Sequence, residues 1–424
     1  MPAEPVAPPA VTEDDPGGRT ARRLVTVVAL AALLPALYRP GLNHKFLDLK
    51  IYMSAMDWWR AGHPLYDYVQ PDRVQGLLYF TYPPLAGLVL WPFALPRLGV
   101  TIAIFTVLTV VGVVVTTRWL VLPLVRRHDL PKLFSVTVAV LLVLAVESTR
   151  ETITFGQINM LLVVLILGDL LFAVPQGRRW AGVGVGLAAA LKLFPGIFVL
   201  YLLATRRWRA AVVASVTATL ATLLAAAVAP GDSWRFWTHE LWATDRVGRT
   251  DYTGNQSLFG LLSRITAPDK PSQLPWLLLA LLVAGYGLWR AARAARVGDA
   301  LAGLTLTGLV GGLVSPITWS HHLYWFIPAV VVLIDAALDA DPATVEGARR
   351  RRWLLVLAVG TGLVIVYGVV TFQDWGVAPA RTDDPVDFVV RNAYVLLSLL
   401  LLAVLPSRRP APPAGADAPA GNGH

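Results

Sequence analysis

Long apolar runs separated by short polar segments occupy this chain from about residue 24 to residue 405, and they restrict its fold more than any other feature. Hydrophobic residues make up 56% of the 424 residues and charged residues only 15%, whereas about a quarter of a soluble domain is charged. A helix of roughly 17–25 apolar residues crosses the hydrocarbon core of a bilayer. Each backbone polar group in a bilayer needs an internal partner, and a helix supplies all of them. The runs therefore predict an all-α polytopic membrane protein.

The apolar runs predict about twelve transmembrane helices within one domain of residues 19–406. Residues 1–18 are rich in proline and acid, and residues 407–424 in proline, alanine and glycine, so we expect two disordered cytoplasmic tails. The first run has no small-residue cleavage site after it, so we expect a retained span and not a signal peptide. The runs lie at residues 24–38, 77–95, 100–122, 133–146, 158–174, 180–203, 210–228, 276–289, 300–314, 323–334, 353–370 and 388–405, and several must borrow flanking residues.

Clusters of arginine set the expected orientation in the plasma membrane. The clusters at 19–23, 206–209, 290–296, 349–352 and 408–409 fall on one face, which the positive-inside rule makes cytoplasmic. The outer face then receives residues 39–76, 230–275, 315–322 and 371–387. A further cluster at 126–132 would lie outside. Either this cluster is an exception, or one span between residues 77 and 174 has been counted in error.

Charge and motif content exclude several classes of protein. The net charge of +9 fits positive-inside loops and anionic headgroups better than nucleic-acid binding. The chain has no cysteine, which excludes disulfides, thiolate metal sites and a cysteine nucleophile. It also has no Walker A motif, no Rossmann glycine fingerprint and no HExxH. These absences leave nucleotide-driven transport and nucleotide-sugar chemistry on a Rossmann fold without support.

Asp48 comes soon after the first run, in a segment that we expect to form a short helix on the membrane surface. A positioned carboxylate can take the proton of an acceptor hydroxyl as a new bond forms, an effect of typically ~10²–10⁴-fold. Asp48 could equally be a charge in the first helical turn that interacts with the helix dipole. Position alone favours neither interpretation. One face of the helix would carry Leu47, Ile51, Ala55 and Trp58, with Asp48 and Tyr52 on an adjoining face.

His321 and His322 are adjacent in an outer loop, and Lys192 is isolated in the middle of an apolar run. Adjacent residues point about 100° apart on a helix, so at most one histidine faces a given site. The histidines could contact a donor phosphate or an acceptor, lie at headgroup level, or contribute with Asp48 to a metal site. A charge at the bilayer centre costs at least ~2.5–3.5 kcal/mol, so Lys192 either faces a polar cavity, where a lipid phosphate is a fitting partner, or snorkels to an interface.

Two more polar segments contain candidate residues. Residues 147–159, with Arg150 and Gln157, would lie inside and away from Asp48, but would move outside if one span was miscounted. In the outer loop of residues 230–275, Asn255 and Gln256 could bind sugar hydroxyls, or this could be an ordinary polar loop.

An ordered set of motifs from about residue 24 to residue 405 resembles glycosyltransferase family eighty-seven, a group of actinobacterial GT-C enzymes. No single motif is decisive, but the ordered set is specific. The motifs are Asp48-Leu49 with Tyr52, Gly62-His63-Pro64-Leu65-Tyr66, Phe80-Thr81-Tyr82-Pro83-Pro84-Leu85, Phe155-Gly156-Gln157-Ile158-Asn159, Lys192-Leu193-Phe194-Pro195, Gly254-Asn255-Gln256-Ser257-Leu258 and Ser315-Pro316-Ile317-Thr318-Trp319-Ser320-His321-His322.

The resemblance implies a GT-C fold and sugar transfer on the outer face of the plasma membrane, with a polyprenyl-phosphate sugar as donor and no cofactor. Well-known members are α-(1→2)-mannosyltransferases that use polyprenyl-phosphate mannose to build phosphatidylinositol mannosides, lipomannan and lipoarabinomannan. The expected partners are the bilayer, the lipid-linked sugar and a glycolipid acceptor, with no nucleic acid and no metal. The resemblance makes Asp48 the catalytic base and places His322, or secondly His321, near the donor. We expect Lys192 and Arg150 to bind the donor phosphate as well, and Tyr52, Tyr82, Asn255, Gln256 and Gln157 to bind substrate.

Three alternatives stay open. The family also contains an arabinofuranosyltransferase, so the donor could carry arabinose. A transporter or flippase of lipid-linked sugar would explain the spans and Lys192, but not the polar residues gathered in the outer loops. A structural subunit of a cell-envelope complex would have no activity when purified.

Overall fold

The computed structural model describes residues 44–72, 76–243, 246, 248–368 and 381–407, and these residues are mostly helical. The expected first span, both expected tails and the arginines at 19–23 and 408–409 lie outside the described residues. Among the described residues the helices pack around one apolar core, and a two-stranded hairpin is the only sheet.

In the part of the chain that the structure describes, three helices are long and apolar enough to cross a membrane: α4 (Leu98–Arg127), α10 (Trp208–Val228) and α13 (Gln273–Arg296). Two bent pairs raise this to five if each pair is one span: α5 (Lys132–Ala145) with α6 (Glu147–Phe155), bent by 62°, and α17 (Pro385–Arg391) with α18 (Ala393–Val404), bent by 73°. Much of the apolar surface of the long helices faces outward, as membrane contact requires. The helical membrane class is thereby confirmed, and the count of about twelve spans stays a prediction.

The other helices are shorter or more charged. They are α7 (Asn159–Gly168) with η3 (Asp169–Ala173), α8 (Val183–Leu191), α9 (Ile197–Ala204), α14 (Ala300–Val314), α15 (Phe326–Leu338) and α16 (Val345–Tyr367). The α14 helix has the bounds predicted from its apolar run. Gly308 of α14 lies against the indole of Trp325, so close that a Cβ atom could not be added there.

The predicted span at residues 77–95 is wrong. Strand β1 (Val69–Asp72) pairs antiparallel with β2 (Gly76–Tyr79), and the rest of the run forms only α3 (Pro84–Leu90) and η2 (Trp91–Ala94). Prolines at the first positions of α3 and η2 prevent one continuous helix, because proline lacks the N–H that an interior turn needs. The run is therefore a hairpin followed by short helices.

The predicted span at residues 180–203 is divided at Lys192. Lys192 follows α8 in an extended conformation, with φ −152° and ψ 123°, before η4 (Phe194–Gly196) and α9. Gly182 lies against Ala210, and Gly186 lies against Ala214, so α8 runs parallel to α10. Because α10 begins beside the start of α8, the chain must run back through α9 before α10 starts. The α8 and α9 helices therefore form a helical hairpin, and Lys192 lies at its turn.

These two corrections change the side of the membrane on which we expect the segments between residues 95 and 180. Without a span at 77–95, the cluster at residues 126–132 moves to the face of the other arginine clusters. At that end Arg127 pairs with Asp335 near the end of α15, and His128 Nε2 lies 2.9 Å from the same carboxylate. Residues 147–157 then move to the opposite face, together with Asp48. The second explanation offered for the discrepant cluster, a miscounted span, agrees with the structure.

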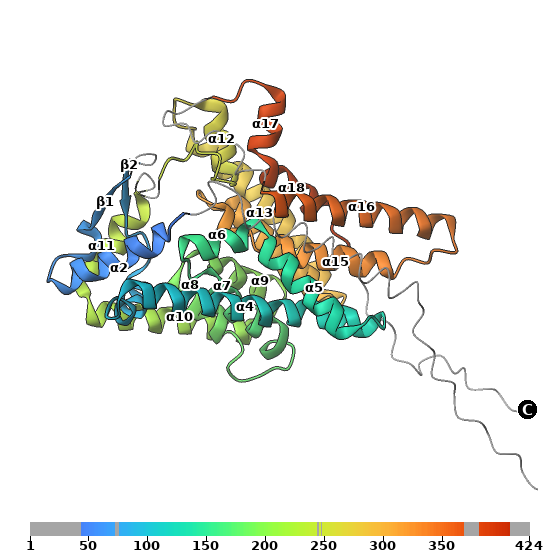
Figure 1. The fold of residues 1–424 in the computed structure, drawn as a ribbon, viewed down its shortest axis with the longest axis horizontal. Coiled ribbons are helices and arrows are strands. Elements are labelled where there is room, and N and C mark those ends of the chain that lie inside the picture. The colour runs from blue at the N-terminus through green and yellow to red at the C-terminus, as the bar shows by residue number, and fades with distance from the viewer. Residues whose placement is uncertain (1–43, 73–75, 244–245, 247, 369–380, 408–424) are drawn as a thin grey trace, which may run out of the picture.

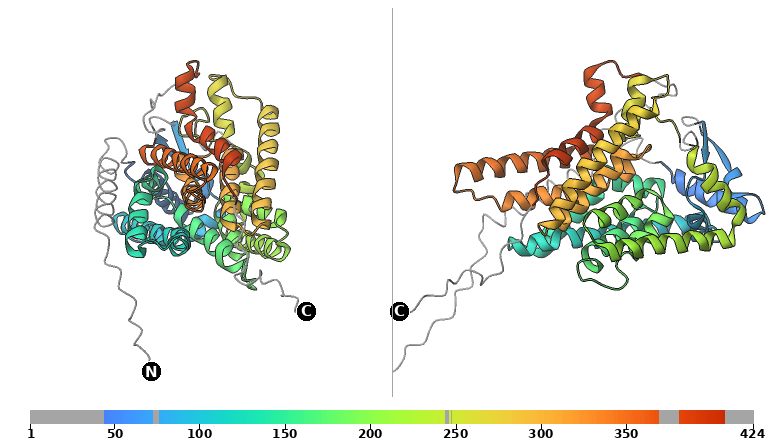
Figure 2. Two further views of the ribbon diagram at one scale, coloured as in Figure 1. Left: turned by 90° about the vertical axis from the view of Figure 1, so that its right-hand side faces the viewer. Right: turned by 180° about the vertical axis from the view of Figure 1, so that it is seen from behind.

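Short elements gather at the end of the molecule that carries Asp48 (Figure 1). They are α2 (Leu47–Arg60), η1 (Leu65–Asp67), the β1–β2 hairpin, α11 (Pro230–Thr238) and η5 (Glu240–Trp242), while α12 (Leu258–Thr266) lies beside α17. Figure 2 shows the same separation from behind: the blue elements stay at one end, and the orange pair α15 and α16 extends toward the other.

The α2 helix confirms the predicted short helix but packs into the protein instead of only lying on the membrane. Its buried side chains include Leu49, Tyr52 and Met56. Trp58, which was expected on the apolar face of this helix, is exposed. Asp232 of α11 accepts hydrogen bonds from Trp59 Nε1 and from the backbone N–H of Leu65, each at 2.9 Å. These bonds hold α2 at a fixed position over the core.

Candidate active site

A cavity of about 700 Å³ opens between α2, the segment before α3, the turn after α8 and the loop that contains η7 (Ser320–His322). This volume lies within the range of roughly 300–1,000 Å³ that is usual for small-molecule sites. Asp48, Tyr52, Tyr82, Gln157, Lys192, His321 and His322 all line it. The structure thus brings together seven of the ten residues singled out from the sequence.

Asp48 stands at the end of a chain of hydrogen bonds. Gln157 Nε2 donates to Asp48 Oδ2, and Tyr82 donates its hydroxyl proton to Gln157 Oε1 at 2.7 Å. Tyr52 in turn donates to the Tyr82 hydroxyl oxygen at 2.8 Å. Asp48 lies in the first turn of α2, where it can interact with the helix dipole. It also lines the cavity, as a base would have to. Its Oδ1 atom has no hydrogen bond to Gln157.

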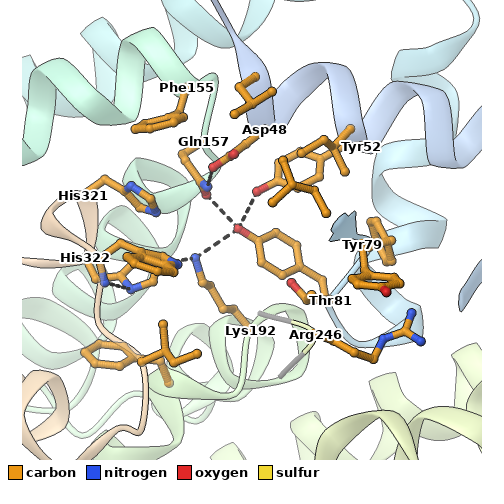
Figure 3. A pocket seen from close by; sticks show the side chains of 18 of the residues that line it. Asp48, Tyr52, Tyr79, Thr81, Phe155, Gln157, Lys192, Arg246, His321 and His322 are labelled. Carbon is orange, nitrogen blue, oxygen red and sulfur yellow. Dashed lines mark hydrogen bonds between the residues drawn. The ribbon is translucent and has the colours of Figure 1, made fainter. Parts of the chain in front are cut away.

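Lys192 faces the same hydroxyl from the other side of the cavity. Its Nζ lies 3.0 Å from the Tyr82 hydroxyl, 3.0 Å from Asn159 Oδ1 and 2.9 Å from His322 Nε2. Figure 3 shows Lys192 and His322 next to each other, with Gln157 and Asp48 above them. The break in the helical run at Lys192 is what turns this side chain into the cavity, so Lys192 does not snorkel.

The two histidines have different environments, as expected for adjacent positions. The backbone N–H of Trp319 donates to His322 Nδ1 at 3.2 Å, so both ring nitrogens of His322 have partners. His321 is only 5% exposed, and neither of its ring nitrogens makes a hydrogen bond. The nearest carboxylate oxygen, Glu151 Oε2, lies 3.9 Å from His321 Nδ1. The His321 ring therefore keeps both nitrogens for an incoming polar group, whereas those of His322 are already engaged.

Glu151 and His44 also line the cavity; Glu151 lies in the candidate segment of residues 147–159 but was not singled out there, and His44 was not predicted from the sequence. Glu151 accepts a hydrogen bond from the Ser320 hydroxyl and lies 3.9 Å from His44 Nε2. The His44 ring stacks on Phe155 with 3.7 Å between ring centroids. Burial lowers the pKa of His44 to about 4, so this imidazole is neutral at physiological pH. The position of Glu151 on the segment wrongly expected inside hid it from sequence analysis.

The opposite side of the cavity carries a second group that the sequence did not reveal (Figure 3). The Arg246 guanidinium lies over the Tyr79 ring, 4.1 Å from its centroid. Arg246 Nε forms an ion pair with Glu240 Oε2 at 2.8 Å, and the Tyr66 carbonyl accepts a hydrogen bond from Arg246 Nη2 at 2.7 Å. A cation and an aromatic ring held in this way form a rigid wall that faces Asp48 across the cavity.

Three predicted site residues do not line the cavity. Arg150 is buried on α6, outside the lining. Asn255 is wholly buried, and its side chain bonds the backbone of Thr250, Pro316 and Thr318. Gln256 donates to the carbonyl oxygens of Thr253 and Arg391, and it accepts from the N–H of Tyr394. The amides of Asn255 and Gln256 therefore hold loops together, and their expected contact with sugar hydroxyls has no support in the structure.

Burial is the main influence on the Asp48 carboxyl. It raises the pKa of Asp48 from 3.8 to about 6, against the opposing effect of the Gln157 hydrogen bond. A carboxylate with such a pKa is ionised near neutral pH, yet basic enough to take a proton in a transition state. The cavity thus has a carboxyl group of raised pKa on one side and the side-chain nitrogens of Lys192 and the two histidines on the other.

One group of described residues has side chains spaced to hold a metal ion, and it lies away from the cavity: His128, Asp335 and Asp339, where Arg127 also pairs with Asp335. In the cavity, His321, Glu151 and Asp48 also offer nitrogen and oxygen atoms, but these are not among the described groups that are spaced to hold a metal ion. Lys192 Nζ lies between Tyr82 and His322 there.

Known proteins resemble this chain along most of its length. The model of glycosyltransferase family 87 matches residues 80–316. A polyprenol-phosphate-mannose-dependent alpha-(1-2)-phosphatidylinositol mannoside mannosyltransferase of Mycobacterium tuberculosis is 34% identical over 76% of this chain and 75% of the relative. A polyprenol-phosphate-mannose-dependent alpha-(1-2)-phosphatidylinositol pentamannoside mannosyltransferase of Mycolicibacterium smegmatis is 35% identical over 78% of each chain. An alpha-(1->3)-arabinofuranosyltransferase of Mycobacterium tuberculosis is a more distant relative, 26% identical over 84% of each chain.

Among solved structures, ArnT from Cupriavidus metallidurans bound to undecaprenyl phosphate matches with a TM-score of 0.37 and 20% identity, over 90% of this chain and 77% of that one. The family model covers more than half of the chain, and the mannosyltransferase relatives exceed a third in identity over most of their length. This chain therefore belongs to glycosyltransferase family 87.

Proposed function

We propose that this glycosyltransferase transfers mannose, with inversion, from polyprenyl-phosphate mannose to a mannosylated lipid or lipoglycan, in an α-1,2 linkage. The observation that carries the proposal is Asp48 facing Lys192 and His322 across one cavity of about 700 Å³. The two mannosyltransferase relatives support the donor, the sugar and the linkage by their described activities. The arabinose donor has the weaker support of a relative 26% identical.

The base role falls to Asp48. Gln157 holds Oδ2, so Oδ1 is the atom that would accept the proton of the acceptor hydroxyl. As that proton moves to Asp48, the hydroxyl oxygen forms a bond to the anomeric carbon, and the bond from that carbon to the phosphate oxygen breaks. A single displacement of this kind converts a β-linked mannosyl phosphate into an α-mannoside. One carboxylate suffices, because the acceptor itself is the nucleophile and no water must be activated.

The leaving phosphate gains negative charge and needs donors. Lys192 at the turn between α8 and α9 lies beside His322 of η7, and His321 has both ring nitrogens free of hydrogen bonds. We assign the stabilisation of the leaving phosphate to these side chains, with no metal or cofactor in the proposal. Preorganised donors aimed at developing charge commonly contribute ~2.7–4 kcal/mol each to a barrier.

The proposal places the cavity at the outer face of the plasma membrane, within a GT-C fold. The arginine clusters at residues 126–132, 206–209 and 349–352 support this orientation once the span at 77–95 is removed. The acceptor is a glycolipid in the same leaflet.

Product analysis with purified enzyme tests the function. Labelled polyprenyl-phosphate mannose and polyprenyl-phosphate arabinose are each incubated with mannosylated phosphatidylinositol acceptors, and the products are analysed for sugar, linkage and anomeric configuration. Formation of an α-1,2-mannoside from the mannose donor is the expected result. Transfer from the arabinose donor alone would replace the donor assignment. Movement of the lipid-linked sugar across proteoliposomes without any transfer would favour a flippase.

A further inference from the structure

Lys192 has three polar neighbours, and their donor and acceptor roles determine which protons Lys192 can carry. Asn159 Nδ2 donates to the carbonyl of His321 at 2.9 Å, so Asn159 Oδ1 faces Lys192 and accepts from it. The Tyr82 hydroxyl gives its one proton to Gln157 and therefore also accepts from Lys192. These two contacts use two N–H bonds of Lys192 Nζ.

His322 is the third neighbour, and its tautomer is set from the other side of the ring. The backbone N–H of Trp319 donates to His322 Nδ1 at 3.2 Å, so Nδ1 is unprotonated. A neutral imidazole then carries its proton on Nε2 and donates it. Nε2 lies 2.9 Å from Lys192 Nζ, so Nζ must accept that proton through a lone pair. An amine has such a lone pair, and an ammonium has none.

The charged alternatives each bring two donors together. With Lys192 as an ammonium and His322 neutral in the same tautomer, two N–H groups would face each other across 2.9 Å. If the His322 proton moved to Nδ1, it would face the N–H of Trp319. Only the neutral amine satisfies every neighbour, with two N–H donors and one accepted bond.

We propose that Lys192 is a neutral amine in the substrate-free enzyme and takes up one proton from solvent when the phosphodiester of the lipid-linked sugar binds. This inference rests on the proposed function, which supplies the anion. The titratable groups that face Lys192 are Asp48 from α2, Tyr82 from the segment before α3, and His321 and His322 from η7. The carboxylate of Asp48 favours the ammonium, and enclosure in the cavity opposes it until the anion arrives.

The charge state explains why a lysine suits this turn better than an arginine. A guanidinium keeps its charge at any physiological pH, whereas an ammonium can lose its proton in an enclosed site. A neutral Lys192 leaves no unpaired cation in the empty cavity. When the lipid-linked sugar binds, its phosphodiester charge enters the cavity and Lys192 takes up a proton at the same time. Donor affinity should therefore weaken as pH rises, because the proton must come from an ever lower concentration.

Calorimetry of donor binding in buffers with different ionisation enthalpies tests the proposal, with detergent-solubilised full-length enzyme and no acceptor. The probe is a short-chain polyprenyl phosphomannose, whose phosphodiester keeps a single charge throughout. Wild-type enzyme should take up about one proton per donor near neutral pH. Lys192→Arg should bind with no uptake, because its charge is permanent. His321→Gln tests the neighbouring histidine as the rival proton acceptor, and the uptake should persist in this variant whatever its donor affinity.

Each outcome separates the inference from the proposed function. Donor binding by the wild type without proton uptake overturns the inference and leaves the function intact. No donor binding at all overturns both. Uptake that survives in Lys192→Arg but is lost in His321→Gln would assign the proton to the histidine. If Lys192→Arg does not fold, the wild-type dissociation constant decides: it should rise by up to ~10-fold per pH unit, and a flat profile contradicts a neutral Lys192.

Discussion

Gln157 donates its side-chain amide to Oδ2 of Asp48, although 109 positions separate the two residues in the sequence. The bond crosses from the turn after α6 to the first turn of α2, and it leaves only Oδ1 of Asp48 for a substrate. An amide cannot pass a proton along, so the chain from Lys192 through Tyr82 to Gln157 orients Asp48 but does not relay its proton. Asp48 and Lys192 therefore share one hydrogen-bonded framework, but no proton passes between them through it.

Asp48→Asn should reduce transfer by at least ~10²-fold, because it removes the base and keeps the shape of the side chain. Donor binding and folding should stay close to wild type. Asp57→Asn is the matched control: Asp57 lies on the same helix, is exposed and pairs with Arg60. Turnover of labelled polyprenyl-phosphate mannose measures both variants. A rate for Asp48→Asn above about a tenth of wild type would remove Asp48 from the base role.

The acid limb of the pH profile should report Asp48. Burial raises the pKa of this carboxyl to about 6, and the base must be ionised to take a proton. We expect kcat/KM to fall by up to ~10-fold per pH unit as the pH drops below this pKa. Replacing Gln157 by Leu removes a hydrogen bond that stabilises the carboxylate, so the midpoint should move to higher pH. A midpoint that stays unchanged in that variant would contradict the assignment of the limb to Asp48.

Tyr82→Phe should lower kcat more than it raises the KM for the donor. The Tyr82 hydroxyl makes hydrogen bonds with Tyr52, Gln157 and Lys192, and its removal breaks all three. Loss of one such contact in an active site typically costs on the order of 0.5–1.5 kcal/mol, or more where a charged group is left unpaired. The matched control is Tyr68→Phe, since the Tyr68 hydroxyl bonds Gln70 outside the cavity. Equal losses in the two variants would point to general destabilisation instead.

Asn255→Ala should destabilise the protein and leave the substrate constants of the folded enzyme nearly unchanged. The Asn255 amide bonds three backbone groups, from Thr250, Pro316 and Thr318, in a site with no exposure. Buried groups left without partners cost ~1–3 kcal/mol each, so thermal unfolding should begin at a clearly lower temperature. Thermal unfolding in detergent and the KM values for donor and acceptor measure the two effects. A selective rise in the acceptor KM at wild-type stability would restore Asn255 as a sugar ligand.

Local patterns in the sequence were sufficient for some parts of the structure. The apolar runs gave α10 and α14 close to their bounds, because composition and length alone decide whether a helix suits a bilayer. The isolated charge of Lys192 pointed to a cavity, and the structure places it there. Asp48 and Tyr52 were expected on one side of a short helix, and both line the cavity from α2.

Other parts depended on breaks and long-range contacts. The run at 77–95 is as apolar as a span, but Pro84 and Pro92 divide it, and β1 supplies a pairing partner that hydropathy does not detect. The error reversed the expected side of Glu151, and so its place in the site was missed. Asn255 and Gln256 have the side chains of sugar ligands, and only the fold shows that backbone groups already occupy them.

Single cysteines should show that residue 133 shares a face with residue 345 and not with residue 57. The chain has no cysteine, so each introduced thiol is the only one present. Leu133 is 84% exposed and Val345 90% exposed, and the Asp57 side chain is 62% exposed. A membrane-impermeant maleimide added to intact cells should label Asp57→Cys, and should label Leu133→Cys and Val345→Cys only after the membrane is opened. Labelling of Leu133→Cys from outside would restore the span at 77–95, and it would place Gln157 on the opposite side of the membrane from Asp48, against their hydrogen bond.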